Sequence, residues 1–363
     1  MSLPHQATTT GSPGTRSESR LDWIDILKAI GIVLVVIGHC KGFPGVPNKW
    51  IFTFHIPLFF LVSGFLLSGD LNKGGFTVFA RRRLLPLLRA YLVFGLIGIV
   101  FFTLFARFSF STRIPWPEAV TERFIALLHG SGTIEGPLRI RPIVLWFFPA
   151  LILGLATCFM LFRLPSPRAR SLAFAGTGAL AWQCRDLALP WEIESALAAV
   201  PILGCGCFLA RHAGVLSWLQ GIPIWGIAAL LVIGSWVAMG ADSTPDFRSS
   251  SVASPLHTIP AAAILLTGFI ALAMRLRAWR WVRALSAATL VIFPLHTMVF
   301  MLIDGITKRL PMVPPGFIDS HAVYAIGKTA ATLVMLTLIA PRISRWLRPK
   351  ANFIAVPGTT LSR

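Results

Sequence analysis

Apolar residues in this chain are concentrated in long runs that short polar segments separate. A mostly apolar helix of about 20 residues matches the roughly 30 Å hydrocarbon core of a lipid bilayer. Runs of this kind are predicted at residues 23–40, 50–68, 84–106, 143–162, 172–190, 196–210, 222–240, 256–274, 285–303 and 322–341. The pattern therefore predicts an all-α polytopic membrane protein with about ten transmembrane helices.

The overall composition agrees with a membrane protein. Hydrophobic residues make up 55% and charged residues 13% of the 363 residues, whereas a soluble domain carries about 25% charged residues. Residues 1–20 are rich in Ser, Thr, Gly and Pro, and they predict a disordered cytoplasmic tail without a secretory signal. We expect residues 21–345 to form one transmembrane domain and residues 346–363 to form a second cytoplasmic tail.

Lys and Arg are concentrated in every second polar segment, and this pattern predicts the orientation of the chain. If the N-terminus is cytoplasmic, the inner segments hold 20 of the 33 Lys and Arg residues but only four of the 14 Asp and Glu residues. Cytoplasmic loops carry such an excess of Lys and Arg, so both termini are expected in the cytoplasm. The net charge of +19 follows from this topology and from attraction to anionic lipid. We expect no nucleic-acid partner, because no single module collects the charge.

The first predicted span carries three ionisable residues, Asp25, Lys28 and His39. Ionisable residues at a bilayer centre cost roughly 2.5–3.5 kcal/mol each on insertion scales, so their presence needs a reason. At about 100° per residue, all three lie on one stripe of the helix. Asp25 and Lys28 are near the cytoplasmic end and are spaced to pair, whereas His39 lies about 16 Å beyond Lys28.

Two further histidines are predicted at about the depth of His39. His55 lies near the outer end of the second span, and His296 lies in the outer half of the ninth. A buried neutral imidazole is suited to removing a proton from a weakly acidic hydroxyl. A hydrogen bond between helices is the alternative role for each histidine. Further along the second span, Ser63 and Gly64 allow another helix to approach closely.

Metal chemistry and proton pumping are not expected. The five cysteines are scattered without a CxxC or Cys/His spacing, so neither a disulfide framework nor a metal site is predicted. A proton pump normally needs more carboxylates within its spans than Asp25 and Asp304, which both lie near span ends.

Five segments occur in a distinctive order along residues 20 to 340: LDWIDILKAIGIVLVVIGHCKG, FTFHIPLFFLVSGFLLSG, RRRLLPLLRAY, VLWFFPALIL and ATLVIFPLHTMVF. Together they resemble the membrane acyltransferase 3 family, in the branch of fucose 4-O-acetylase-like and exopolysaccharide sugar O-acetyltransferases. The resemblance implies a ten-span enzyme of the bacterial cytoplasmic (inner) membrane. Such an enzyme transfers acetyl from acetyl-CoA to a sugar hydroxyl of an exported or cell-surface polysaccharide, for example a mannose of a xanthan-type polymer.

The resemblance also implies roles for individual residues. The family's first-span histidine corresponds to His39, and its basic partner eleven residues earlier, often Arg, is Lys28 here. Taken together with the positions and chemistry of the other polar and aromatic residues, the predicted set is catalytic His39, His55, Lys28 and Asp25, acyl-CoA-binding Arg81, Arg82 and Arg83, and acceptor-binding Trp146, His296 and Ser63. Acetyl-CoA is the expected acyl donor, and no metal cofactor is expected. The other expected partners are a lipid-linked or polymeric glycan, membrane lipid and other polysaccharide-assembly proteins.

Two alternative functions remain open at the level of sequence. A multi-pass glycan or lipid transporter and a non-catalytic subunit of an export complex both have many spans and a polar interior. A transporter built from inverted repeats has Gly- or Pro-interrupted spans in corresponding halves. We find no convincing repeat of this kind in the chain.

Overall fold

The computed structural model describes residues 21–43, 48–109, 115–130, 144–187, 189–247, 255–311, 313–314 and 316–347. The two predicted tails lie outside these ranges except for Trp346 and Leu347. The described residues form helices and no strand. The helices are α1 (Asp22–His39), α2 (Asn48–Ser68), α3 (Phe76–Phe79), η1 (Ala80–Leu84), α4 (Leu85–Ser109), α5 (Trp116–His129), α6 (Phe147–Leu161), α7 (Pro167–Cys184), η2 (Pro190–Glu192), α8 (Ile193–Arg211), α9 (Ala213–Gly221), α10 (Ile224–Met239), α11 (Pro255–Ala273), α12 (Arg280–Thr307), α13 (Phe317–Ser320) and α14 (Ala322–Leu347).

Every predicted span overlaps one helix, and the helices concerned are α1, α2, α4, α6, α7, α8, α10, α11, α12 and α14. In the described part of the chain, 6 spans are long and apolar enough to cross a membrane, those of α2, α4, α8, α11, α12 and α14. The number rises to 7 if α9 and α10, which are bent by 96° relative to each other, count as one span. This architecture is that of a polytopic membrane protein. The count of about ten spans and the cytoplasmic position of the termini stay predictions.

Two helices differ from the sequence prediction. α7 begins at Pro167, because Ser166 Oγ accepts a hydrogen bond from the Ala169 amide at 3.0 Å and caps the helix. It ends at Cys184, before the predicted end of that span. α5 lies between the third and fourth predicted spans, where no helix was predicted, and it ends at His129, followed by the C-cap Gly130, whose φ of 71° favours glycine.

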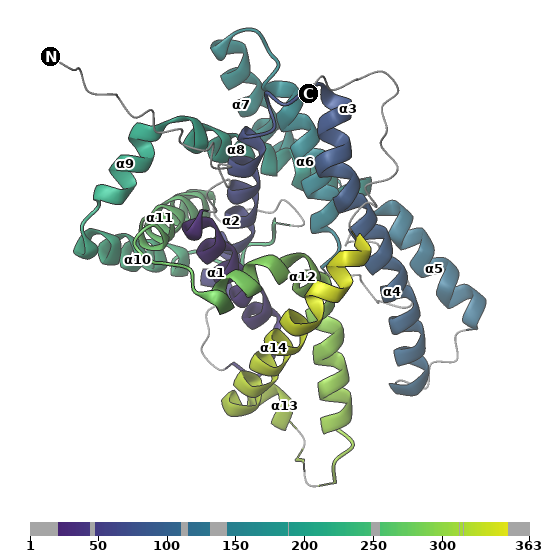
Figure 1. Cartoon of the computed structure of the whole chain (residues 1–363). Coiled ribbons are helices and arrows are strands. Elements are labelled where there is room, and N and C mark those ends of the chain that lie inside the picture. Colours follow the sequence, from purple (N-terminus) through teal and green to yellow (C-terminus); the bar gives the residue numbers. More distant parts are fainter. Residues whose placement is uncertain are drawn as a thin grey trace, which may run out of the picture.

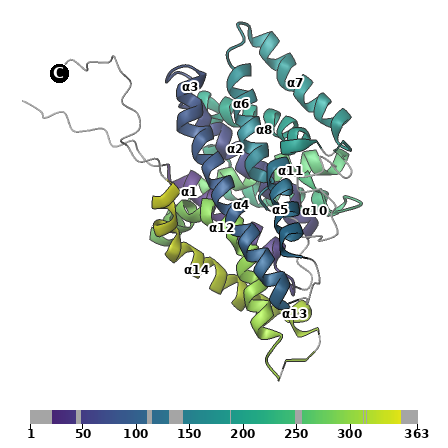
Figure 2. The ribbon, with the colours of Figure 1, turned by 90° about the vertical axis from the view of Figure 1, so that its right-hand side faces the viewer.

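Helices from distant parts of the sequence pack around α1 and α2, which lie near the centre of the molecule (Figure 1). α12 packs along α1, and α8 packs along α2. α10 and α11 pack together on one side of this centre, while α4 and α5 lie on the other. The perpendicular view shows α4 in front of the central helices and α14 along the lower left (Figure 2).

The crossing of α2 and α8 depends on two glycines. A Cβ at Gly64 would overlap the backbone of Leu203, and a Cβ at Gly206 would overlap the backbone of Leu61. Cys207 Sγ lies 2.9 Å from the Gly64 carbonyl oxygen at the same crossing. The close helix approach predicted at Gly64 is therefore confirmed. It fixes α2, the helix that carries His55, against α8.

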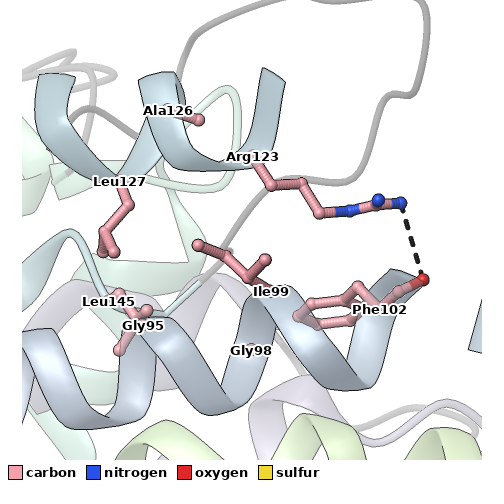
Figure 3. A pocket seen from close by; sticks show the side chains of 8 residues that line it. All are labelled: Gly95, Gly98, Ile99, Phe102, Arg123, Ala126, Leu127 and Leu145. Carbon is pink, nitrogen blue, oxygen red and sulfur yellow. Dashed lines mark hydrogen bonds between the residues drawn. The ribbon is translucent and has the colours of Figure 1, made fainter. Parts of the chain in front are cut away.

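α5 is held on α4 by a buried arginine and by a close contact at a glycine (Figure 3). Arg123 Nη1 donates to Thr103 Oγ1 at 2.9 Å, and its Nη2 reaches the Phe102 carbonyl oxygen at 3.5 Å. Leu127 packs against Gly95, where a Cβ would collide with the leucine side chain. The space left between the two helices is about 20 Å³, which is room for about one water molecule. We therefore assign no ligand to it.

A buried ion pair joins α12 to α14. Lys328 Nζ lies 2.8 and 3.1 Å from the two carboxylate oxygens of Asp304, and the side chains are 1% and 21% exposed, respectively. The Tyr324 hydroxyl donates to the same carboxylate at 2.8 Å. Lys328 Nζ also lies 5.1 Å from the centre of the Phe300 ring, and the centre of that ring lies 6.0 Å from that of His296. The ion pair is thus part of the packing behind this histidine.

Candidate active site

A cavity of about 430 Å³ lies where the C-terminal end of α1 meets the N-terminal half of α2. The start of α6, the middle of α12 and the connector between α10 and α11 complete its wall. Two histidines and four aromatic residues are among the side chains that line it: His39, His55, Phe52, Trp146, Phe247 and Phe293. A concave, mostly apolar cavity with a few convergent polar groups is typical of a small-molecule site.

His39 is the last residue of α1, and its own helix orients its ring. Nδ1 lies 2.8 Å from the Val35 carbonyl oxygen. Because a carbonyl oxygen only accepts hydrogen bonds, we assign the proton of the neutral ring to Nδ1. Nε2 then keeps a lone pair. A ring in this tautomer at the cavity wall can accept a proton from a bound molecule.

His55 repeats this arrangement on α2. Its Nδ1 lies 2.7 Å from the Ile51 carbonyl oxygen, and its side chain is buried. The ring of Phe52 lies beside both histidines, with its centre 5.0 Å from that of His55 and 5.7 Å from that of His39. The structure therefore brings His39 and His55 to one cavity, as their predicted depths indicated.

His296 lies on α12, directly beside His39. The ring centres are 5.1 Å apart, and the planes meet at 72° in an edge-to-face contact. His296 Nδ1 lies 2.8 Å from the Phe293 carbonyl oxygen, while its Nε2 is buried without a hydrogen-bond partner among the described residues. The side chain is fully buried and is not part of the cavity wall. Its position therefore suits packing against His39 better than direct contact with an acceptor.

Asp25 and Lys28 lie at the opposite end of α1 from His39. About 16 Å of helix separates Lys28 from His39, and the described cavity wall includes neither Asp25 nor Lys28. Asp25 is buried and accepts a hydrogen bond of 2.5 Å from Ser286 Oγ on α12. This bond fixes α1 against the helix that carries His296. Sequence reasoning missed Ser286, because nothing in its local pattern indicates its partner.

The predicted acyl-CoA cluster forms the π-helical turn η1 between α3 and α4. Arg81 and Arg82 are exposed. Arg83, in contrast, forms an ion pair through Nε with Asp70, whose side chain is buried. The Arg83 guanidinium therefore ties η1 to the turn that follows α2. Of the three arginines, Arg81 and Arg82 are the ones fully available at the surface.

The predicted acceptor residues Trp146 and Ser63 have different positions. Trp146 precedes α6 and lines the cavity. Ser63 lies eight residues after His55 on α2, about 12 Å along the helix axis. It is not part of the described cavity wall. The structure thus brings Trp146 to the two histidines but does not bring Ser63 there.

The connector between α10 and α11 contributes to the cavity, which sequence reasoning did not anticipate. Four consecutive residues line the cavity, Thr244, Pro245, Asp246 and Phe247. They belong to the segment between the seventh and eighth predicted spans, and no sequence motif marks them. Their Pro-Asp pair in a loop facing the predicted outer side was the only available signal.

No set of three or more His, Cys, Asp or Glu side chains in the described ranges is arranged to hold a metal ion.

Comparison with known proteins identifies the family. A family model described as an acyltransferase domain matches residues 21–340, which include all the helices around the cavity. Neither the curated proteins nor the solved structures gave a match. Because the matched region covers most of the 363 residues, the chain belongs to the membrane acyltransferase 3 family that its motifs resemble.

Proposed function

We propose that this membrane acyltransferase transfers an acetyl group from acetyl-CoA to a sugar hydroxyl of an exported or cell-surface polysaccharide. The observation that carries the proposal is the pair of histidines at one aromatic cavity, each with Nδ1 against a carbonyl oxygen of its own helix. Such rings act as bases through Nε2. The acceptor is a lipid-linked or polymeric glycan at the bacterial cytoplasmic (inner) membrane.

His39 is the proposed general base of the transfer. Its Nε2 takes the proton of the acceptor hydroxyl while the hydroxyl oxygen attacks the thioester carbonyl carbon of acetyl-CoA. The C–S bond then breaks, and the coenzyme A sulfur leaves with the proton returned by the imidazolium. The products are an acetyl ester and free coenzyme A. Positioned general-base catalysis of this kind contributes about 10²- to 10⁴-fold to the rate.

The neighbouring polar residues act mainly by positioning His39. His55 lines the same cavity and provides a second polar contact for the reactants, and His296 packs edge-on against the His39 ring. Asp25 holds α1 to α12 through Ser286. Lys28 lies three residues after Asp25, on the same stripe and at the same end of α1.

Arg81 and Arg82 are the proposed contacts for the phosphates of acetyl-CoA, and Arg83 supports the turn that presents them. The excess of basic residues in the predicted inner segments supports a cytoplasmic position for both termini and for this turn, on the side where acetyl-CoA is found. The extended pantetheine arm then runs between helices towards His39. Guanidinium groups bind phosphate through charge-assisted hydrogen bonds.

Replacing Arg81 and Arg82 together by glutamine is expected to raise the KM for acetyl-CoA about tenfold, while kcat at saturation changes by less than about twofold. Phosphate contacts far from the reacting carbon contribute equally to ground-state and transition-state binding. Steady-state kinetics on purified protein measure the change. The matched control replaces the exposed Arg168 and Arg342 by glutamine and removes the same charge. An equal rise in KM in both double variants would assign the effect to overall charge.

The proposed function is tested by mass analysis of the surface polysaccharide. A strain of the source organism that lacks this protein is expected to make polysaccharide with fewer groups of the mass of acetyl, and re-expression of the wild-type chain restores them. An unchanged acyl content in the deletion strain would refute the assignment of a polysaccharide acceptor. Loss of the whole polymer instead of its acetyl groups would favour a transport or export function.

A further inference from the structure

His296 has one ring nitrogen that the folded chain leaves without a partner. Its Nδ1 lies 2.8 Å from the Phe293 carbonyl oxygen and 3.2 Å from that of Ile292, so we assign the proton of the neutral ring to Nδ1. Nε2 then keeps a lone pair, and this atom is buried without a hydrogen-bond partner among the described residues. A buried acceptor without a donor is unfavourable, and few such atoms occur in folded proteins. The lone pair of His296 Nε2 therefore needs a reason.

The ring that lies beside His296 is that of His39. The ring centres are 5.1 Å apart, and the rings share an edge-to-face contact instead of a hydrogen bond. His39 Nδ1 is engaged by the Val35 carbonyl oxygen of its own helix, as His296 Nδ1 is by Phe293. Nε2 is therefore the nitrogen that each ring has left for an interaction with another group. Ring centres at this separation allow a hydrogen bond between two ring nitrogens, and the torsion that turns a histidine ring is soft.

This arrangement favours the charged form of His39 over the neutral form. When His39 Nε2 takes a proton, it becomes a donor beside a buried acceptor that has no donor of its own. A hydrogen bond between the two satisfies His296 Nε2, and bonds from a charged group are stronger than neutral ones. Neutral His39 has no proton on Nε2, so the bond is absent in the ground state. An interaction that forms only as the reaction proceeds raises kcat without tightening substrate binding.

We propose that His296 Nε2 accepts a hydrogen bond from protonated His39 during acyl transfer and so stabilises the imidazolium until its proton reaches the coenzyme A sulfur. This inference rests on the proposed function and gives His296 a role beyond packing. The proton stays on His39 until it is delivered to the sulfur, so no further group has to take it up. His296 is a positioning residue, because it acts through His39 and is not part of the described cavity wall.

Two substitutions of His296 separate this role from packing. His296→Phe keeps an aromatic ring against His39 but has no acceptor, whereas His296→Gln loses the ring but can place a carbonyl oxygen near the position of Nε2. We expect His296→Phe to lower kcat about 10- to 100-fold, with less than about twofold change in either KM, because the lost bond is made only to the charged ring. His296→Gln is expected to keep kcat within about threefold of the wild type. Transfer of labelled acetyl and release of coenzyme A by protein in nanodiscs measure these constants.

The matched control makes the same two changes at His212, which is exposed and has the same local Nδ1 bond. Both control variants should keep wild-type activity.

A packing role alone predicts the reverse order, with His296→Phe close to the wild type and His296→Gln impaired. That order, or equal kcat values for the two variants, would overturn the inference. If the larger phenylalanine prevents folding, His296→Leu replaces it with the same expected loss. If His296→Gln does not fold, an unchanged kcat in the apolar variant would overturn the inference, and a lower kcat at unchanged KM would support it. A folded wild-type chain that transfers no acetyl would refute the proposed function, whereas an active wild type with the reverse order counts against His296 alone.

Discussion

Replacement of His39 by alanine is expected to lower the rate of acetyl transfer at least about 100-fold while the protein still inserts and folds. The expected loss follows from the general-base role, which is commonly worth about 10²- to 10⁴-fold. The fold should tolerate the change, because the His39 Nδ1 bond to the Val35 carbonyl oxygen is local to α1 and lies at its last turn. Product formation from labelled acetyl-CoA measures the rate.

The matched control for this variant is His212→Ala. His212 has the same bond from Nδ1 to a carbonyl four residues earlier, at 2.8 Å, but it is exposed and lies outside the described cavity wall. We expect this control to keep wild-type activity. Comparable activity in His39→Ala and His212→Ala would remove His39 from the mechanism.

Replacement of His55 by alanine is expected to reduce the rate less than replacement of His39. In our proposal His55 orients the reactants in the cavity but does not take the proton. The kcat and the acceptor KM of His55→Ala should therefore both change, with a residual rate well above that of His39→Ala. Equal and complete loss at both positions would instead indicate that the two imidazoles share one proton path.

Replacement of Asp304 by leucine is expected to lower the thermal stability of the purified protein strongly. The change leaves the Lys328 ammonium, which is 1% exposed, buried without its carboxylate. Breaking a buried ion pair costs about 3–5 kcal/mol. We expect about 2–4 kcal/mol here, because the Asp304 side chain is 21% exposed and exposure weakens the pair. Such a loss lowers the Tm by several degrees.

The double variant Asp304→Leu/Lys328→Met separates an ion-pair effect from a packing effect. Removing both charges removes the uncompensated ammonium, so the Tm should return most of the way to that of the wild type. The control is Asp319→Asn, which breaks the exposed contact of 3.9 Å between Lys41 and Asp319 and should change the Tm by less than about 1 °C. A double variant as unstable as the single variant would show that Asp304 stabilises the fold through Tyr324 or through packing alone.

Much of the helical architecture could be predicted from hydrophobic runs. The second predicted span, 50–68, corresponds to α2 over Asn48–Ser68 because its apolar residues form an almost continuous run. The position of α7 could not be predicted as well. Its start is set by the Ser166 cap and not by the apolar run. α5 was missed because it carries too little apolar sequence to stand out within a loop.

The sequence could predict only those features of the candidate site that follow from the position of each residue along its own helix. His39 lies at the end of the first span and His55 lies near the start of the second. Counting residues along the two spans therefore places both histidines at a similar depth. The placement of Asp246 depends on Lys49 and Ser195, which hold its connector from two other helices. Such long-range contacts leave no periodic signal. The same reason explains why the Asp70 partner of Arg83 was not anticipated.

The most direct test of the account is acetyl transfer by the purified protein in lipid nanodiscs. The protein is given acetyl-CoA labelled in the acetyl group and lipid-linked glycan extracted from a strain of the source organism that lacks it. Our account predicts that the wild-type chain transfers label to the glycan in step with release of coenzyme A, and that His39→Ala does neither. Label transfer by His39→Ala at the wild-type rate, or no transfer by a folded wild-type chain, would contradict the account.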